Sequence, residues 1–292
     1  MSGQSSHSKI LHSSDGCEIF AEATGDPKSL HVVLIHGITL SGAVFDDFCR
    51  QPELLKELYI VRYDLRGHGR SGGPEALEAH QSKLYADDFM AVVRGFRLNK
   101  PVLVGWSVGG TIAVDLCANV DPLPISGVFY LSSVLSIPAA FSGAGTPFLI
   151  SQLRACSDPA TTTAGLLGLV AGCFDAPSTR PPSYHLRCLV AGMQMMQSAA
   201  VRASILQRTQ DTEKFWKRLE QGLPVFVYHG SHDALTDAGA LVRDVMSRAS
   251  NVRVRIVEEA GHVLFYEDPQ ETARVILDFV KSVQRQTHEL VK

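Results

Sequence analysis

Apolar residues occur along most of the chain in short runs that alternate with segments of helical spacing. Runs rich in β-branched and aromatic residues are typical of strands, and they predict strands at residues 30–35, 58–62, 101–105, 126–131, 223–228 and 251–257. Apolar positions three to four residues apart predict helices just after residue 107 and at residues 44–57, 80–97, 208–221, 236–248 and 270–284. This alternation predicts an α/β fold, with a mostly parallel central sheet covered by helices on both faces.

Two regions depart from this alternation. Residues 9–13 and 17–23 alternate apolar and polar around Ser14-Asp15-Gly16, which predicts a hairpin at the antiparallel edge of the sheet. Residues 134–206 show no strand pattern and consist of helix-like pieces interrupted by prolines. We therefore expect a core domain formed by residues 1–133 and 207–292, with residues 134–206 inserted above the sheet as a helical lid.

The strand predicted at residues 101–105 leads directly into Gly105-Trp106-Ser107-Val108-Gly109-Gly110 and then into a helix. A serine on such a tight turn has an exposed hydroxyl, and the first free N–H groups of the following helix point toward whatever it attacks. We expect glycine at positions 105 and 109 because a side chain there would collide with the neighbouring strand or helix. Ser107 is therefore a candidate nucleophile, and the alternative is an ordinary turn with a helix-capping serine.

A serine hydroxyl is a weak nucleophile at neutral pH and needs a base, which in turn needs an anion to orient it. Asp233 follows the strand predicted at residues 223–228, and His262 follows the last predicted strand. Because the carboxyl ends of parallel strands meet at one edge of a sheet, these side chains can converge on Ser107. The competing acids are weaker candidates, since they lie within a predicted helix, before the strand or on a solvated loop edge: Asp237, Asp211, Glu258 and Glu259.

The composition and the net charge of the chain exclude several classes of function. The 292 residues are 45% hydrophobic and 20% charged, which is ordinary for a globular protein, and the formal net charge of −3 offers no basic face for nucleic acid or acidic lipid. The polar amino terminus lacks the apolar segment of a secretory signal, so we expect a soluble, cytoplasmic protein with no membrane partner. The six cysteines have no metal-ligand spacing, and we expect mostly buried free thiols, no metal and no cofactor.

The sequence resembles the α/β-hydrolase superfamily nearly from end to end. The motifs that match are His36-Gly37, Asp64-x-Arg66-Gly67-x-Gly69-x-Ser71, the glycine-flanked Ser107, Gly230-x-x-Asp233 and Gly261-His262. The resemblance implies the α/β-hydrolase fold, with Ser107 as nucleophile, Asp233 as acid and His262 as base. It also implies that the backbone amide of Ile38 completes an oxyanion hole with the amide of Val108, and that His36 braces a loop.

These features together predict a serine hydrolase that cleaves an ester-like bond of a small, largely apolar substrate through an acyl-enzyme. Trp106, beside the apolar Ile38 and Val108, is expected to bind substrate. Apolar residues of the lid are expected either to form an adaptable roof over it or to pack the lid onto itself: Met193, Met195, Met196, Phe141, Phe148 and Leu149. Lactonases, perhydrolases, carbon–carbon bond hydrolases and acyltransferases use the same three residues. A receptor-like protein that binds a ligand without turnover is the alternative of another class, and the oligomeric state stays open.

Overall fold

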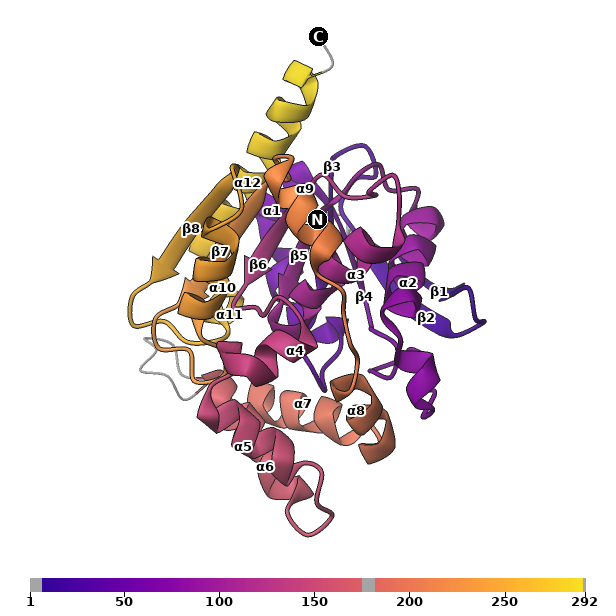
Figure 1. The fold of residues 1–292 in the computed structure, drawn as a ribbon, viewed down its shortest axis with the longest axis vertical. Coiled ribbons are helices and arrows are strands. Elements are labelled where there is room, and N and C mark those ends of the chain that lie inside the picture. The colour runs from indigo at the N-terminus through magenta and orange to yellow at the C-terminus, as the bar shows by residue number, and fades with distance from the viewer. Residues whose placement is uncertain (1–6, 175–181, 291–292) are drawn as a thin grey trace.

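One mixed sheet forms the centre of the molecule (Figure 1). The computed structural model describes residues 7–174 and 182–290. Its eight strands lie in the order β1-β2-β4-β3-β5-β6-β7-β8; β1 and β2 are antiparallel to their neighbours and the others are parallel. Their bounds are β1 (His7–His12), β2 (Glu18–Thr24), β3 (Leu30–Ile35), β4 (Leu58–Tyr63), β5 (Val102–Trp106), β6 (Gly127–Leu131), β7 (Val225–Gly230) and β8 (Val252–Val257). The predicted α/β sheet with an antiparallel edge hairpin is confirmed.

Helices cover both faces of the sheet, and successive strand residues contribute to a separate core on each side. Phe129 packs with Phe279 of α12 on one face, whereas the next residue, Tyr130, packs with Phe215 of α9 on the other. Burial of each such side chain contributes roughly 1.5–3 kcal/mol. The first face carries α1 (Pro52–Glu57), α11 (Leu264–Glu267) and α12 (Pro269–Leu290), and the second carries α2 (Ser82–Phe96), α3 (Ile112–Asn119), α9 (Glu213–Glu220) and α10 (Ala238–Met246).

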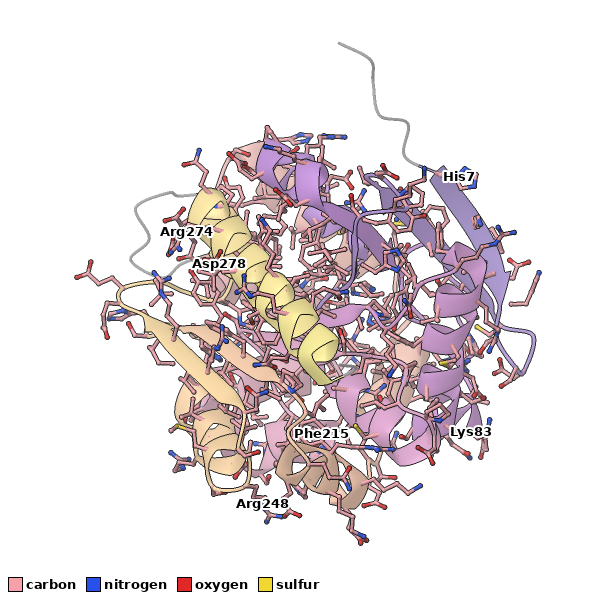
Figure 2. The ribbon with its side chains drawn as sticks, turned by 90° about the horizontal axis from the view of Figure 1, so that it is seen from above. His7, Lys83, Phe215, Arg248, Arg274 and Asp278 are labelled. Carbon is pink, nitrogen blue, oxygen red and sulfur yellow. The ribbon has the colours of Figure 1, made fainter. Side chains whose placement is uncertain are left out.

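The long carboxyl-terminal helix illustrates why these segments are helical. Ile276, Phe279, Val280 and Val283 recur at helical spacing and are buried against the sheet. The opposite side of α12 is charged and carries the ion pair between Arg274 and Asp278 at 3.1 Å, which Figure 2 shows in the view from above.

Two of the predicted helices are shorter in the structure. Residues 44–57 are not one helix: two 3₁₀ turns, η1 (Gly42–Phe45) and η2 (Phe48–Arg50), precede α1, which begins at Pro52 because proline suits the first helical position. The helix predicted at residues 208–221 begins only at Glu213. Gln210 instead crosses to α3, where its Nε2 donates to the carbonyl oxygen of Thr111 (3.1 Å) and to Asp115 Oδ1 (3.1 Å).

The segment after β6 is helical, as its pattern predicts. Its elements gather beyond the carboxyl ends of the strands (Figure 1), and side-chain oxygens of Ser136, Thr146, Ser183 and Ser198 cap helices there. Residues 175–181 of the predicted lid lie outside the described residues. The elements are α4 (Ile137–Ala139), η5 (Ala140–Ala144), α5 (Pro147–Ala155), α6 (Thr162–Phe174), α7 (Tyr184–Met195) and α8 (Ala199–Leu206).

Within the described ranges, none of the helices combines the length and the apolar character needed to cross a membrane. All six cysteines are free thiols, and four of them are buried: Cys49, Cys117, Cys156 and Cys173.

Candidate active site

Ser107 lies at the turn between β5 and the 3₁₀ turn η4 (Ser107–Thr111), which leads into α3. Its φ angle is +54°, a strained conformation for a residue with a side chain that costs roughly 1–3 kcal/mol. The adjoining loop holds this turn, because the hydroxyl of Ser133 donates to the carbonyl oxygen of Ser107 at 2.5 Å. In the described structure Trp106, not Ser107, is at the N-cap position of η4, and no side-chain hydrogen bond caps this turn.

Two glycines let the turn pack this closely. A β-carbon at Gly105 would lie 2.3 Å from the Cα of Gly110, and one at Gly109 would lie 2.3 Å from the carbonyl oxygen of Ile35. Both distances are shorter than any tolerable contact, so the expected collisions are confirmed. The glycines let η4 pack closely against β3 and β5. The side chain of Ser107 lies on the uncrowded side of the turn.

The loop after β3 passes directly beside the serine. A β-carbon on Gly37 would lie 3.2 Å from the Cβ of Ser107, so the backbone that leads into Ile38 is in contact with the turn. His36 holds this loop: its Nε2 accepts a hydrogen bond from the Leu65 amide at 3.0 Å, and its Nδ1 donates to the Gly37 carbonyl at 2.7 Å. Burial lowers the pKa of His36, which favours the neutral tautomer that this pattern needs.

Asp233 lies just past β7, and both of its carboxylate oxygens accept hydrogen bonds. Oδ1 accepts from the amides of Leu235 (2.8 Å) and Thr236 (3.0 Å), and Oδ2 accepts from the Thr236 hydroxyl (2.7 Å) and from Nδ1 of His262 (2.7 Å). Burial alone would raise the pKa of Asp233, but attraction to His262 and the hydrogen bonds from His229 and His262 outweigh it and hold this pKa far below its usual range. The group is therefore an anion at neutral pH.

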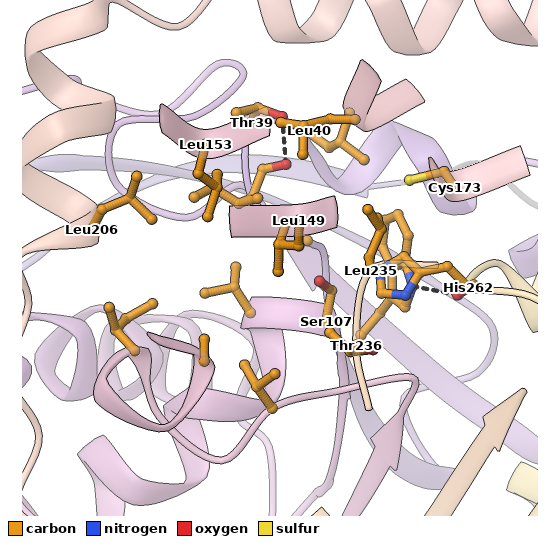
Figure 3. Close-up of a pocket in the computed structure, with 18 of the residues that line it drawn as sticks. Thr39, Leu40, Ser107, Leu149, Leu153, Cys173, Leu206, Leu235, Thr236 and His262 are labelled. Carbon is orange, nitrogen blue, oxygen red and sulfur yellow. Dashed lines mark hydrogen bonds between the residues drawn. The ribbon is translucent and has the colours of Figure 1, made fainter. Parts of the chain in front are cut away.

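His262 is 1% exposed and is held on several sides. Since its Nδ1 donates to Asp233, its Nε2 is left for the pocket. Its carbonyl oxygen accepts from Nε1 of Trp106 at 2.9 Å, the contact drawn beside it in Figure 3. The carboxylate of Glu267 accepts hydrogen bonds from the backbone amides on either side of His262, those of Gly261 (2.8 Å) and Val263 (3.3 Å). Sequence reasoning missed Glu267, for which the sequence carries no recognisable motif.

A second histidine contacts the acid. The Nε2 of His229 lies 3.0 Å from Asp233 Oδ2 and 3.1 Å from the carbonyl oxygen of Thr236, and the ring is fully buried. Its Nδ1 has no partner among the described residues. The sequence places His229 near a strand end, but the family pattern assigns it no role. In the structure β7 continues to Gly230, so His229 is a buried strand residue.

Ser107 and His262 line the same cavity, which Figure 3 shows between the strand ends and the helices above them. The cavity, together with the open solvent at its mouth, has an empty volume of about 630 Å³. Its wall includes Gly37, Thr39, Gln194 and Thr236, and is otherwise apolar: Ile38, Leu40, Trp106, Val108, Val134, Ile137, Ala140, Phe141, Leu149, Leu153, Leu169, Cys173, Leu206 and Leu235.

The structure brings most, but not all, of the predicted site residues to this cavity. Ile38, Trp106 and Val108 line it together with the serine and the base. Met193 and Met196 are not among its lining residues. Met193 is buried with its sulfur 3.5 Å from the Ser41 hydroxyl, and Met196 is 72% exposed because it follows the last turn of α7. Of the other apolar lid residues predicted for the roof, Phe141 and Leu149 line the cavity, whereas Met195 and Phe148 do not. Leu153 of α5 and Leu169 of α6, which were not predicted, also line it.

Comparison with known proteins agrees with this arrangement. Residues 32–275 match the model of the Alpha/beta hydrolase family. The chain is 26% identical over 285 residues to the pimeloyl-[acyl-carrier protein] methyl ester esterase of Methylococcus capsulatus, covering 90% of this chain and 99% of that one. A crystal structure of a protein described as an aryl esterase from Burkholderia cenocepacia superposes with a TM-score of 0.84 at 26% identity, over 96% of this chain and 100% of that one.

A third similarity is local. The protein named Probable oxidoreductase EphD of Mycobacterium tuberculosis is 36% identical over 107 residues, which is 37% of this chain. The match spans only 18% of the length of that relative.

Proposed function

Because the chain belongs to the Alpha/beta hydrolase family, we propose that it is a serine hydrolase that cleaves an ester bond of a small, largely apolar substrate. The observation that carries the proposal is the convergence of three side chains. Ser107, on its strained turn, shares a cavity with His262, and the Nδ1 of His262 lies 2.7 Å from the buried carboxylate of Asp233.

In this mechanism Ser107 Oγ attacks the carbonyl carbon of the substrate while Nε2 of His262 takes the hydroxyl proton. The tetrahedral intermediate then collapses, and His262 gives that proton to the departing alkoxide. Water next attacks the acyl-enzyme, with His262 again accepting a proton and returning it to Ser107. Asp233 stays ionised throughout and stabilises the imidazolium that forms twice per cycle, a role that fits its strongly lowered pKa.

The backbone amides of Ile38 and Val108 are the proposed donors to the oxyanion. The contact of Gly37 with Ser107 supports the first, because it brings the loop alongside the reacting hydroxyl. The second is supported by the place of Val108 in the first turn after the serine, where helical N–H groups lack partners within the helix. Each such donor is worth about 3–4 kcal/mol of transition-state stabilisation in acyl-transfer enzymes.

The apolar cavity supports an apolar substrate, and the helices above it support the proposal that residues 134–206 act as a lid. Leu149 and Leu153 of α5, with Leu169 of α6, supply one side of the wall. An ester is favoured over other substrates because two of the similar proteins bear the name esterase. Lactone hydrolysis, perhydrolysis, carbon–carbon bond cleavage and acyl transfer would use the same three side chains.

A fluorophosphonate probe tests the proposal directly, because it reacts with an activated serine. We expect the native protein to be labelled and to hydrolyse p-nitrophenyl esters, and we expect heat denaturation to abolish labelling. Ser107→Ala should remove both activities and keep the circular dichroism spectrum and the unfolding midpoint. Ester hydrolysis retained in Ser107→Ala would refute the assignment, and ligand binding without labelling would favour the receptor-like alternative.

A further inference from the structure

The wall of the cavity contains a polar side chain that the proposed mechanism does not use. Gln194 lies near the end of α7, is 2% exposed, and lines the same cavity as Ser107. Its Oε1 has no hydrogen-bond partner among the described residues. A buried amide oxygen without a partner costs free energy, because folding removes its hydrogen bonds to water and returns none.

The two threonine side chains on this wall already donate hydrogen bonds to neighbouring residues. The hydroxyl of Thr39 donates to the carbonyl oxygen of Ile38 at 2.6 Å, and the hydroxyl of Thr236 donates to Asp233 at 2.7 Å. Ser107 and His262 are assigned to the reaction itself. Gln194 is thus the polar side chain of the described wall that remains available to a bound molecule.

The position of Gln194 is fixed by contacts of its neighbours on α7. The sulfur of Met193 accepts a hydrogen bond from the Ser41 hydroxyl at 3.5 Å, and Ser41 lies in the loop after β3 that also contains Ile38. Val190, one turn earlier on the same helix, is buried in the core. These contacts hold the end of α7 against the core, so the backbone that carries the Gln194 amide is in place before any ligand arrives.

We propose that Gln194 is a polar subsite that selects substrates carrying one hydrogen-bond donor, a hydroxyl or an amide N–H, on an otherwise apolar acyl chain. The free Oε1 of its terminal amide can accept a hydrogen bond from either group. A plain alkyl chain in the cavity would leave the amide without a partner, and such a site rejects the analogue that lacks the polar group. The subsite refines the proposed hydrolase and rests on it.

Four esters whose acyl chains have equal length test the subsite: p-nitrophenyl hexanoate and the p-nitrophenyl esters of N-propionylglycine, N-acetyl-β-alanine and N-formyl-4-aminobutyric acid, which place an N–H donor at the third, fourth or fifth atom of the chain. We expect the native enzyme to favour at least one of these amide esters over hexanoate by about tenfold or more in kcat/KM. Gln194→Met, which keeps the size of the side chain, should abolish this preference. The intrinsic reactivity of each ester is the same for every variant, so the change in the ratio between variants measures the subsite.

Gln197→Met is the matched control. Gln197 lies three residues further along the chain, is also buried, and also has an Oε1 without a partner among the described residues, but it does not line the cavity. We expect this variant to keep the preference even if its unfolding midpoint falls. An unchanged ratio in Gln194→Met, or an equal loss of preference in Gln197→Met, would overturn the proposal.

A binding measurement separates the subsite from the hydrolase. In the Ser107→Ala background, calorimetry should show the methyl ester of at least one of the three N-acyl amino acids binding about tenfold or more tightly than methyl hexanoate. Adding Gln194→Met should remove the difference. If the native enzyme hydrolyses no ester but the binding preference is present, the proposed function fails and the subsite stands; if esters are hydrolysed with no binding preference, the reverse holds.

Discussion

The two sides of the cavity are built differently. On the side of the sheet, the proposed catalytic corner (Ser107, Asp233 and His262, with His229 against the acid) stands at or just past strand ends, and Asp233 alone accepts hydrogen bonds from two amides, a hydroxyl and two rings. On the opposite side, the roof (α5, α6 and α7) meets the cavity mainly through leucine side chains, beside the amide of Gln194. The corner is defined by directional hydrogen bonds, whereas most of the roof is defined by apolar packing, which tolerates many shapes of substrate.

The largest effect should come from the corner, with Asp233→Asn. The neutral amide cannot stabilise the imidazolium of His262 and favours the wrong tautomer, so kcat should fall by about 10⁴-fold. Rapid kinetics with p-nitrophenyl acetate would measure this fall. A loss of less than tenfold would mean that another group supplies the charge.

The same variant has a defined effect on stability. The pKa of Asp233 in the folded protein lies below its ordinary value of 3.8, so its ionised form stabilises the fold above that pH. The free energy of unfolding of the native protein should therefore exceed that of Asp233→Asn at neutral pH. The difference should shrink as the pH falls below about 4. Denaturant titrations at several pH values would measure it, and a difference independent of pH would contradict the assigned charge.

Substitution of His229 should have the next largest effect, on the free energy of unfolding. A hydrogen bond to a charged group contributes roughly 1.5–3 kcal/mol, so His229→Leu should lower the free energy of unfolding by about that amount. The hydrogen bond from His229 is one of the causes that lower the pKa of Asp233, so this pKa should rise in the variant. Denaturant titrations should then show a smaller loss of unfolding free energy as the pH falls below about 4 than for the native protein.

His229→Gln is the matched control, since its amide nitrogen can reach the position of the ring Nε2 and donate to Asp233. This variant should keep the pH dependence of stability of the native protein. If the leucine and glutamine variants gave the same pH dependence, His229 would be a packing residue only.

The sequence predicts the corner better than the roof for a physical reason. Ser107, Asp233 and His262 each follow a strand, and the parallel sheet brings strand ends together, so local patterns were sufficient to find them. His229 also lies near a strand end, but the family pattern offers no role for it, so its contact with Asp233 emerges only from the structure. The roof depends on how helices pack over the sheet, which apolar spacing does not determine. Of the apolar lid residues predicted for the roof, Phe141 and Leu149 therefore line the cavity, whereas the three methionines do not.

Substitutions in the roof should change selectivity rather than chemistry. Leu169 lines the cavity from α6, so Leu169→Ala should enlarge it and shift the preference toward longer acyl chains. Each additional buried methylene contributes about 0.8 kcal/mol, or about fourfold in kcat/KM. Leu167 on the same helix is 54% exposed and lies outside the cavity, so Leu167→Ala should leave the chain-length profile unchanged. Equal profiles for both variants would show that α6 does not shape the site.

Met196→Ala should give the smallest effect of all. Met196 is 72% exposed and does not line the cavity, so the variant should change stability by no more than about 0.5 kcal/mol and leave kcat/KM for short and long esters within about twofold. Activity across a series of p-nitrophenyl esters would measure this. A selective loss with the long esters would mean that the end of α7 moves onto bound substrate. The roof would then be a mobile element that folds over its ligand, and the contrast with the fixed corner would be sharper than the static contacts show.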